Sequence, residues 1–183
     1  TGILGGSGDD TSYDGTVTGA TYVASGGVTD INAGPNSGAF DYVNQSDRIT
    51  VENVPTDNTS LTVSCSFQAD TFEGFDDMIH FGDNFKHGRL STGFNEGFSV
   101  NLGDGSNATR VDFGTYTTGG FKHVAFTADG STIRGFVDGQ ELNSASGYPS
   151  EVTTQLITIG NLTDPDRPFD AIDGRLDDVR IYN

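Results

Sequence analysis

Residues 61–69 alternate between apolar and polar side chains without a break. Successive side chains of a β-strand point to opposite faces, so this spacing gives a strand one apolar face and one polar face. In a helix the same spacing would scatter the apolar groups around the axis. The segment is therefore predicted to be a strand with one buried side. Its apolar residues are Leu61, Val63, Cys65, Phe67 and Ala69.

Several shorter segments show the same period of two. They are residues 47–54, 77–82, 97–103, 109–114, 123–128, 132–139 and 156–160. Asp-Gly pairs at 129–130 and 138–139 are typical of tight turns, and they predict three consecutive antiparallel strands around residues 132–137. No segment sustains a 3.6-residue period, so at most one short helical turn is expected. Many short strands without helices predict an all-β fold of two packed antiparallel sheets.

The C-terminal segment 171–183 contains a break in its alternation. Ile172 and Leu176 share one parity, whereas Val179 and Ile181 share the other. Both pairs can face the same core only if an extra residue is inserted between them. The sequence therefore predicts a β-bulge near residues 177–178.

Acidic side chains outnumber basic ones by 26 to 9, which gives a formal net charge of −17. This charge disfavours nucleic acids and anionic membranes as partners, and no apolar run reaches the roughly 18 residues of a membrane span. An aspartate-rich, lysine-poor composition resembles that of proteins from salt-loving organisms, although an ordinary acidic extracellular module shares it. Cys65, the only cysteine, alternates with apolar neighbours, which predicts a buried and unreactive thiol.

Five segments occur in a recognisable order: FDYVNQSDRITV (40–51), SLTVSCSFQA (60–69), FKHVAFTADGSTIRGFVDGQEL (121–142), ITIGN (157–161) and GRLDDVRIYN (174–183). Together they resemble laminin-G-like jelly-roll domains of the concanavalin A-like kind. The resemblance covers residues 15–183, which we expect to form the domain, with residues 1–14 as a linker or an irregular leading loop. Phe121 stands where the family usually has tryptophan, and Ser66–Phe67 replaces an Ala-Trp pair. These departures change packing detail rather than topology.

The resemblance implies an extracellular, cell-surface or virion-surface binding module that recognises a glycan or glycoprotein, for example in cell adhesion. An alternative is a structural assembly subunit, such as a virion turret, spike, decoration or envelope protein, that works through self-association. A homo-oligomer or a larger assembly is expected in either case, and fold alone does not decide between them.

A glycoside hydrolase is the third alternative, and the acidic residues argue against it. A retaining glycosidase needs two carboxyl groups about 5–5.5 Å apart, and no glutamate is paired with another acid in such a register. The glutamates are Glu52, Glu73, Glu96, Glu141 and Glu151. The histidines His80, His87 and His123 show no metal-ligand spacing. We therefore expect a protein without enzymatic activity.

Sugar-binding sites in β-sandwiches combine a flat aromatic ring with planar polar groups. Since the chain has no tryptophan, the candidate rings are Tyr116, Tyr148 and Phe94, which lie in turn-rich stretches where alternation does not demand burial. The candidate hydrogen-bonding groups are His80, Arg89 and Arg110.

Calcium is the expected ion, because only oxygen ligands are plentiful. Related jelly-roll modules join the start of the domain to its last strand through calcium, and the resemblance implies Asp10, Asp14 and Asp177 as the ligands here. The segment 164–173 is a second candidate, with the carboxylates Asp164, Asp166, Asp170 and Asp173.

Overall fold

The computed structural model describes residues 15–24, 27, 38–44, 46–57, 60–71, 76–82, 88–93, 97–104, 106–148, 153–160 and 172–182. Within these ranges every regular element is a strand, and the strands form two seven-stranded antiparallel sheets. None of the described residues forms a helix with the length and hydrophobicity that a membrane crossing requires. The two-sheet fold predicted from the alternation is confirmed.

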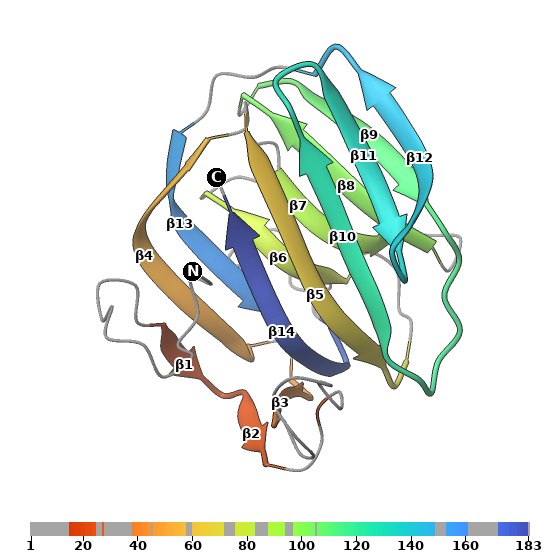
Figure 1. Ribbon diagram of the computed structural model, residues 1–183. Helices are drawn as coiled ribbons and strands as arrows, with labels where there is room; N and C mark the ends of the chain where they lie inside the picture. The colour runs from red at the N-terminus through yellow and green to blue at the C-terminus, as the bar shows by residue number, and fades with distance from the viewer. Residues whose placement is uncertain are drawn as a thin grey trace.

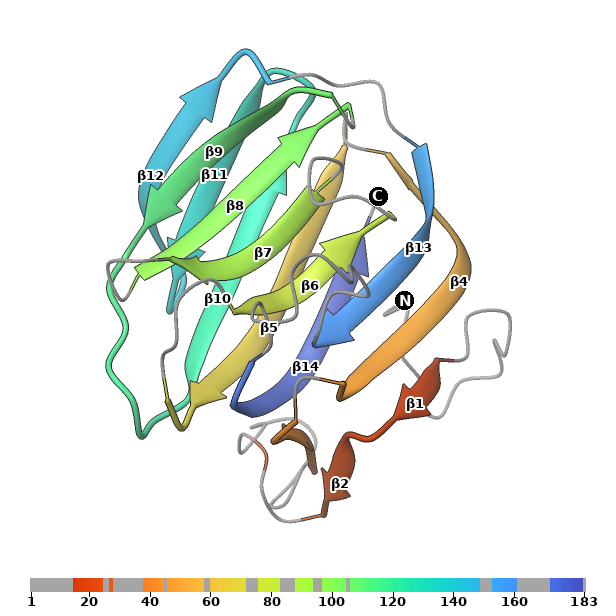
Figure 2. The same ribbon diagram turned by 180° about the vertical axis from the view of Figure 1, so that it is seen from behind.

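Sheet A contains, in spatial order, β1 (Thr16–Thr18), β4 (Arg48–Asp57), β13 (Thr153–Gly160), β6 (Asp77–Phe81), β7 (Gly88–Gly93), β8 (Gly97–Gly103) and β9 (Ala108–Phe113). Sheet B contains β12 (Gln140–Ser146), β11 (Thr132–Val137), β10 (Lys122–Ala128), β5 (Leu61–Ala69), β14 (Gly174–Tyr182), β3 (Ala39–Tyr42) and β2 (Thr21–Val23). Sheet B faces the viewer in Figure 1, and sheet A does so in Figure 2.

The apolar residues of the alternating segments meet between the two sheets. The ring of Phe67 in β5 lies 6.5 Å from that of Phe98 in β8 and 5.6 Å from that of Tyr116, measured between centroids. Further along the interface, Phe81 of sheet A meets Phe126 of sheet B edge to face at 6.2 Å. Aromatic pairs at these spacings add to the stabilisation that burial of their area provides. These contacts make one core that joins both layers.

Cys65 lies inside this core. Its side chain is fully buried in β5, and burial raises the pKa of the thiol to about 12. A thiol reacts as the thiolate, so a group that stays protonated at neutral pH is unreactive. The predicted burial of Cys65 is confirmed, and its raised pKa agrees with the expected unreactive thiol.

Two predicted local features of sheet B are also confirmed. The strands β10, β11 and β12 pair in sequence order, as the two Asp-Gly turns indicated. In β14, Asp177 is opposite Ser66 and Arg180 is opposite Ser64, so two residues of β14 face the single residue Cys65 of β5. This is the predicted β-bulge, and it brings both Leu176 and Ile181 into the core.

Two strands of sheet A, the three-residue β1 and the longer β7, have no counterpart in the sequence predictions. The strand β7 has the sequence GRLSTG, in which Leu90 is the only large apolar residue and both ends are glycine. With one apolar side chain, no period of two can be recognised. The segment pairs with β6 and β8 on its two sides and becomes a central strand through these neighbours.

Candidate functional site

A row of polar side chains crosses sheet A on the face that points away from the core. Thr158 of β13 is opposite His80 of β6, His80 is opposite Arg89 of β7, Arg89 is opposite Asn101 of β8, and Asn101 is opposite Arg110 of β9. Directly opposed residues of antiparallel strands lie on the same face, with strands about 4.8 Å apart. Their neighbours on the other face belong to the core: Ile79, Leu90, Val100, Val111 and Ile159.

A second row lies beside the first. Asp77 is opposite Ser91, Ser91 is opposite Ser99, and Ser99 is opposite Asp112. The Oγ atoms of Ser91 and Ser99 are 2.9 Å apart, within hydrogen-bonding distance. A shift of register in β6 between Asp77 and Ile79 turns Asp77 to the outer face, although simple alternation would place it with Ile79. We call these two rows together the polar strip.

The polar strip contains a buried ion pair. Nη1 of Arg89 donates a hydrogen bond of 3.2 Å to Oδ1 of Asp77, and both side chains are almost completely buried. Such a pair is costly to desolvate, and loss of either partner would leave a charge buried without its counterion. The pair therefore holds the side chain of Arg89 on β7 in a fixed position against Asp77 on β6.

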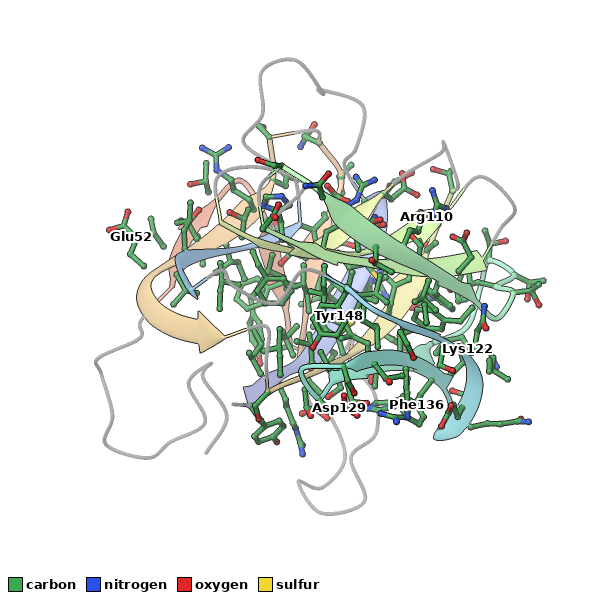
Figure 3. The ribbon with its side chains drawn as sticks, turned by 90° about the horizontal axis from the view of Figure 1, so that it is seen from above. Glu52, Arg110, Lys122, Asp129, Phe136 and Tyr148 are labelled. Atoms are coloured by element: carbon green, nitrogen blue, oxygen red, sulfur yellow. The ribbon has the colours of Figure 1, made fainter. Side chains whose placement is uncertain are left out.

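Exposure to solvent increases along the polar strip towards β9. Thr158, His80 and Arg89 are buried, Asn101 is half-buried and Arg110 is exposed. At this open end, Nε of Arg110 donates a hydrogen bond of 2.7 Å to Oδ1 of Asp112. Figure 3 shows Arg110 on the outer side of sheet A, with Asp129 and Phe136 on the far side of the sandwich. The strip therefore presents a guanidinium, a carboxylate and an amide to solvent side by side.

Sheet B supports the open end. Nδ2 of Asn143 in β12 donates a hydrogen bond of 2.7 Å to the backbone carbonyl of Asp112 in β9. This contact ties the last strand of sheet A to the edge of sheet B. It fixes the backbone from which the side chains of Arg110 and Asp112 project.

The structure brings the three predicted hydrogen-bonding residues together. His80, Arg89 and Arg110 lie in one row on three strands. His80 and Arg89 are buried, so of the three predicted ligand contacts the structure exposes Arg110 alone. Sequence reasoning missed the residues that complete the strip, namely Asn101, Asp77, Ser91, Ser99, Asp112 and Thr158. Asn101 carried a signal, because it stands between the core residues Val100 and Leu102 and so must face outwards.

The predicted stacking rings lie elsewhere. Tyr116 and Tyr148 are only 1% and 5% exposed, so neither presents a ring face to a sugar, and the expectation that they lie at the surface is wrong. The hydroxyl of Tyr116 accepts a hydrogen bond from the backbone N–H of Ala69 and donates one to the carbonyl of Gly120, both 2.8 Å. The hydroxyl of Tyr148 accepts one from Gly130 at 2.7 Å. Each ring thus packs in the core, while its hydroxyl group forms hydrogen bonds with backbone groups of a neighbouring turn or strand. Phe94 lies outside the described residues.

The predicted calcium ligands cannot all be placed. Asp10 and Asp14, like Asp164, Asp166 and Asp170 of the second candidate, lie outside the described residues. Asp177 lies on the outer face of sheet B at the bulge, where its Oδ1 accepts a hydrogen bond of 2.7 Å from the backbone N–H of Asp178. Asp173 accepts a hydrogen bond from Thr71. In the described part of the chain no three metal-ligating side chains gather, and calcium stays a prediction.

Comparison with protein families places the chain in a known superfamily. Residues 43–183 match a laminin G model of the concanavalin A-like lectin/glucanases superfamily. The chain belongs to this superfamily. The match extends over more than half of the chain and includes every strand of the polar strip. Comparison with curated proteins finds no match.

Solved structures of low sequence identity share the concanavalin A-like fold. Domain 4 of AbnA, an extracellular arabinanase from Geobacillus stearothermophilus, in complex with arabinotriose, matches with a TM-score of 0.68 and 19% identity over 92% of this chain and 82% of that chain. The CBM40 of the Ruminococcus gnavus IT-sialidase, bound to α2,3-sialyllactose, matches with a TM-score of 0.56 and 13% identity over 72% and 86%. Domains LG4-5 of mouse laminin α1 give 0.62 and 11% over 78% and 40%.

Proposed function

We propose that this concanavalin A-like domain is a glycan-binding module that holds its ligand on the polar strip of sheet A. The observation that carries the proposal is the register of the strip. Polar groups of five neighbouring strands stand on one outer face, and a buried ion pair lies among them. The strip reaches solvent over β8 and β9, where a ligand can contact Asn101, Arg110 and Asp112.

The strip has the physical properties that sugar recognition requires. Its side chains stand on strands whose other face is the core, so the strand backbones that carry them are fixed before a ligand arrives. Groups fixed in advance lose little conformational freedom on binding, which leaves more of the interaction energy as affinity. Guanidinium, carboxylate and amide groups together offer both donors and acceptors to the hydroxyls of a sugar.

The solved structures support this assignment. Two domains with the same fold are bound to saccharides, arabinotriose in one and α2,3-sialyllactose in the other. The arabinanase is extracellular, and laminin LG domains share the fold as well. We place the present domain outside the cell or on a particle surface, where such ligands occur. The acidic surface suits high salt, where counterions screen its self-repulsion.

Binding without catalysis is part of the proposal. A retaining glycosidase needs two carboxyl groups about 5–5.5 Å apart. Among the glutamates whose side chains the structure describes, Glu52 stands on β4 of sheet A and Glu141 on β12 of sheet B. Asp77, on the strip itself, is engaged with Arg89. These positions favour recognition over hydrolysis.

Replacement of Arg110 by alanine is expected to weaken glycan binding by about tenfold to 100-fold. Hydrogen bonds to charged groups contribute about 1.5–3 kcal/mol, and 1.4 kcal/mol corresponds to a factor of ten. A glycan array identifies the strongest ligand, and calorimetric titration with that glycan measures the change. Because the proposed module binds without hydrolysis, the mass of the glycan recovered after the titration should be unchanged.

Arg134→Ala is the matched control for this experiment. The Arg134 side chain is 36% exposed against 34% for Arg110, and it too pairs with an aspartate, Asp129, at 2.7 Å. It stands on β11 in sheet B, so its loss should change the affinity less than twofold. Equal losses for the two variants would contradict a site on sheet A. If no glycan on any array binds and the protein self-associates in sedimentation experiments, the alternative function as a structural assembly subunit would be favoured instead.

Calcium is retained as a separate proposal, supported by the abundance of carboxylates. If Asp177 contributes to a calcium site, a chelator should lower the melting temperature. A ligand present at about 100 times its Kd stabilises by about 2.7 kcal/mol, which corresponds to about 5–11 °C for a domain of this size. Calcium, but not magnesium, should restore the transition, and Asp177→Asn should abolish the effect. A transition unchanged by the chelator would contradict the proposal.

A further inference from the structure

The arginines of the polar strip are matched by aspartates of the same strip. Arg89 pairs with Asp77 at the buried end, and Arg110 pairs with Asp112 at the open end. The Asp112 side chain is itself well exposed, so a ligand that reaches the Arg110 guanidinium also meets a carboxylate. The strip therefore offers its ligand charged groups without a surplus of positive charge.

The rest of the molecule strengthens this selection against anions. The chain carries 26 acidic and 9 basic side chains, so at low ionic strength its long-range field repels a negatively charged ligand as it approaches. A sugar carboxylate or sulfate on the strip would also lie beside Asp112, where like charges repel. An acidic sugar would thus be opposed at both stages of binding.

A neutral sugar has the opposite relation to the same groups. Each hydroxyl donates one hydrogen bond and accepts others. Neighbouring hydroxyls can therefore donate to the Asp112 carboxylate and accept from the Arg110 guanidinium at the same time. Asn101, opposite Arg110 on β8, adds an amide with both functions.

We infer that the polar strip selects uncharged glycans, and that Asn101, Arg110 and Asp112 contact adjacent hydroxyls of the sugar. The inference rests on the proposed function, since it names the class of glycan that the same site takes. In this arrangement the buried Arg89–Asp77 pair is a positioning element. It holds the strand face in register and leaves contact with the ligand to the open end.

The test compares neutral oligosaccharides with uronate-containing, sialylated and sulfated ones of similar length in one array and by titration. We expect neutral glycans to bind, acidic counterparts to bind about tenfold more weakly, and the affinity for neutral glycans to change less than twofold between 0.1 and 1 M NaCl. Tighter binding of acidic glycans that weakens with salt would overturn the inference while leaving the glycan-binding function intact. Failure of every glycan to bind would overturn both.

Asp112→Asn provides the sharper comparison. This change removes the carboxylate beside Arg110, so the preference for neutral over acidic glycans should shrink several-fold. Asp138→Asn is the control, because it changes the net charge equally and removes an aspartate paired with Lys122 at 2.7 Å. Asparagine also tolerates the positive φ of 50° at this turn position. If both variants shift the preference equally, net charge rather than the strip sets it, and the inference fails.

Discussion

Replacement of Phe67 by alanine is expected to lower the free energy of unfolding by about 3–5 kcal/mol, the range for buried phenylalanine truncations. For a domain of this size, that corresponds to a melting temperature lower by roughly 6–20 °C. The Phe67 ring has no solvent exposure and touches both Phe98 of sheet A and Tyr116. Its removal would open a cavity where the two layers meet. Urea and thermal unfolding at constant salt measure the loss.

The control for Phe67→Ala is Tyr22→Ala. Tyr22 lies on the edge strand β2, where its ring is largely exposed and meets Phe40 edge to face at 5.6 Å. Its loss should cost about 1 kcal/mol or less. If the two variants were equally stable, the junction around Phe67 would not be the centre of the core.

Gly174→Ala is expected to destabilise the domain by about 2–6 kcal/mol. Gly174 has a φ of +151°, which side-chain-bearing residues rarely adopt, and a Cβ there would lie 2.1 Å from the backbone oxygen of Gln68. The backbone strain costs about 1–3 kcal/mol, and crowding adds a similar amount. The neighbouring β5 cannot yield easily, because the atom in the way is backbone. Chemical denaturation would report the change as a lower midpoint.

Gly147→Ala separates the two contributions. Gly147 also has a positive φ, +81°, but a Cβ there would meet nothing within 4 Å. It should cost about 1–2 kcal/mol from conformation alone. A Gly174→Ala variant no less stable than Gly147→Ala would show that β14 is not packed against β5 at this position.

The layers of this fold could be predicted because alternation is a local property of the chain. The positions of Phe67 and Val63 within β5 predict which face of the strand is buried, without information about any other strand. The bulge of β14 could be predicted for the same reason. Leu176 and Ile181 differ in parity, yet both are large apolar residues that favour burial. Both can face the core only if the strand contains an extra residue between them, which is the β-bulge.

The polar strip could be predicted only in part, because it depends on which strands are neighbours. Arg89 and Arg110 are 21 positions apart, and they align only through β8, which stands between their strands. The strand β7 carries Arg89 but has too few apolar residues to be recognised. Asp77 lies on the outer face because of a bulge in β6, and the alternation of the sequence there shows no break that would predict this bulge. The burial of Tyr116 escaped prediction because a tyrosine in a loop can fill a core while its hydroxyl serves a turn.

The central position of β14 in sheet B affects how the domain folds during synthesis. This strand, at residues 174–182, pairs with β5 on one side and β3 on the other, so sheet B is divided until it arrives. During synthesis the edges of β5 and β3 must wait unpaired for more than a hundred residues, and such edges invite aggregation. Nascent chains halted before residue 174 should be captured by chaperones and digested by proteases. Release of the last strand then joins the two parts of sheet B.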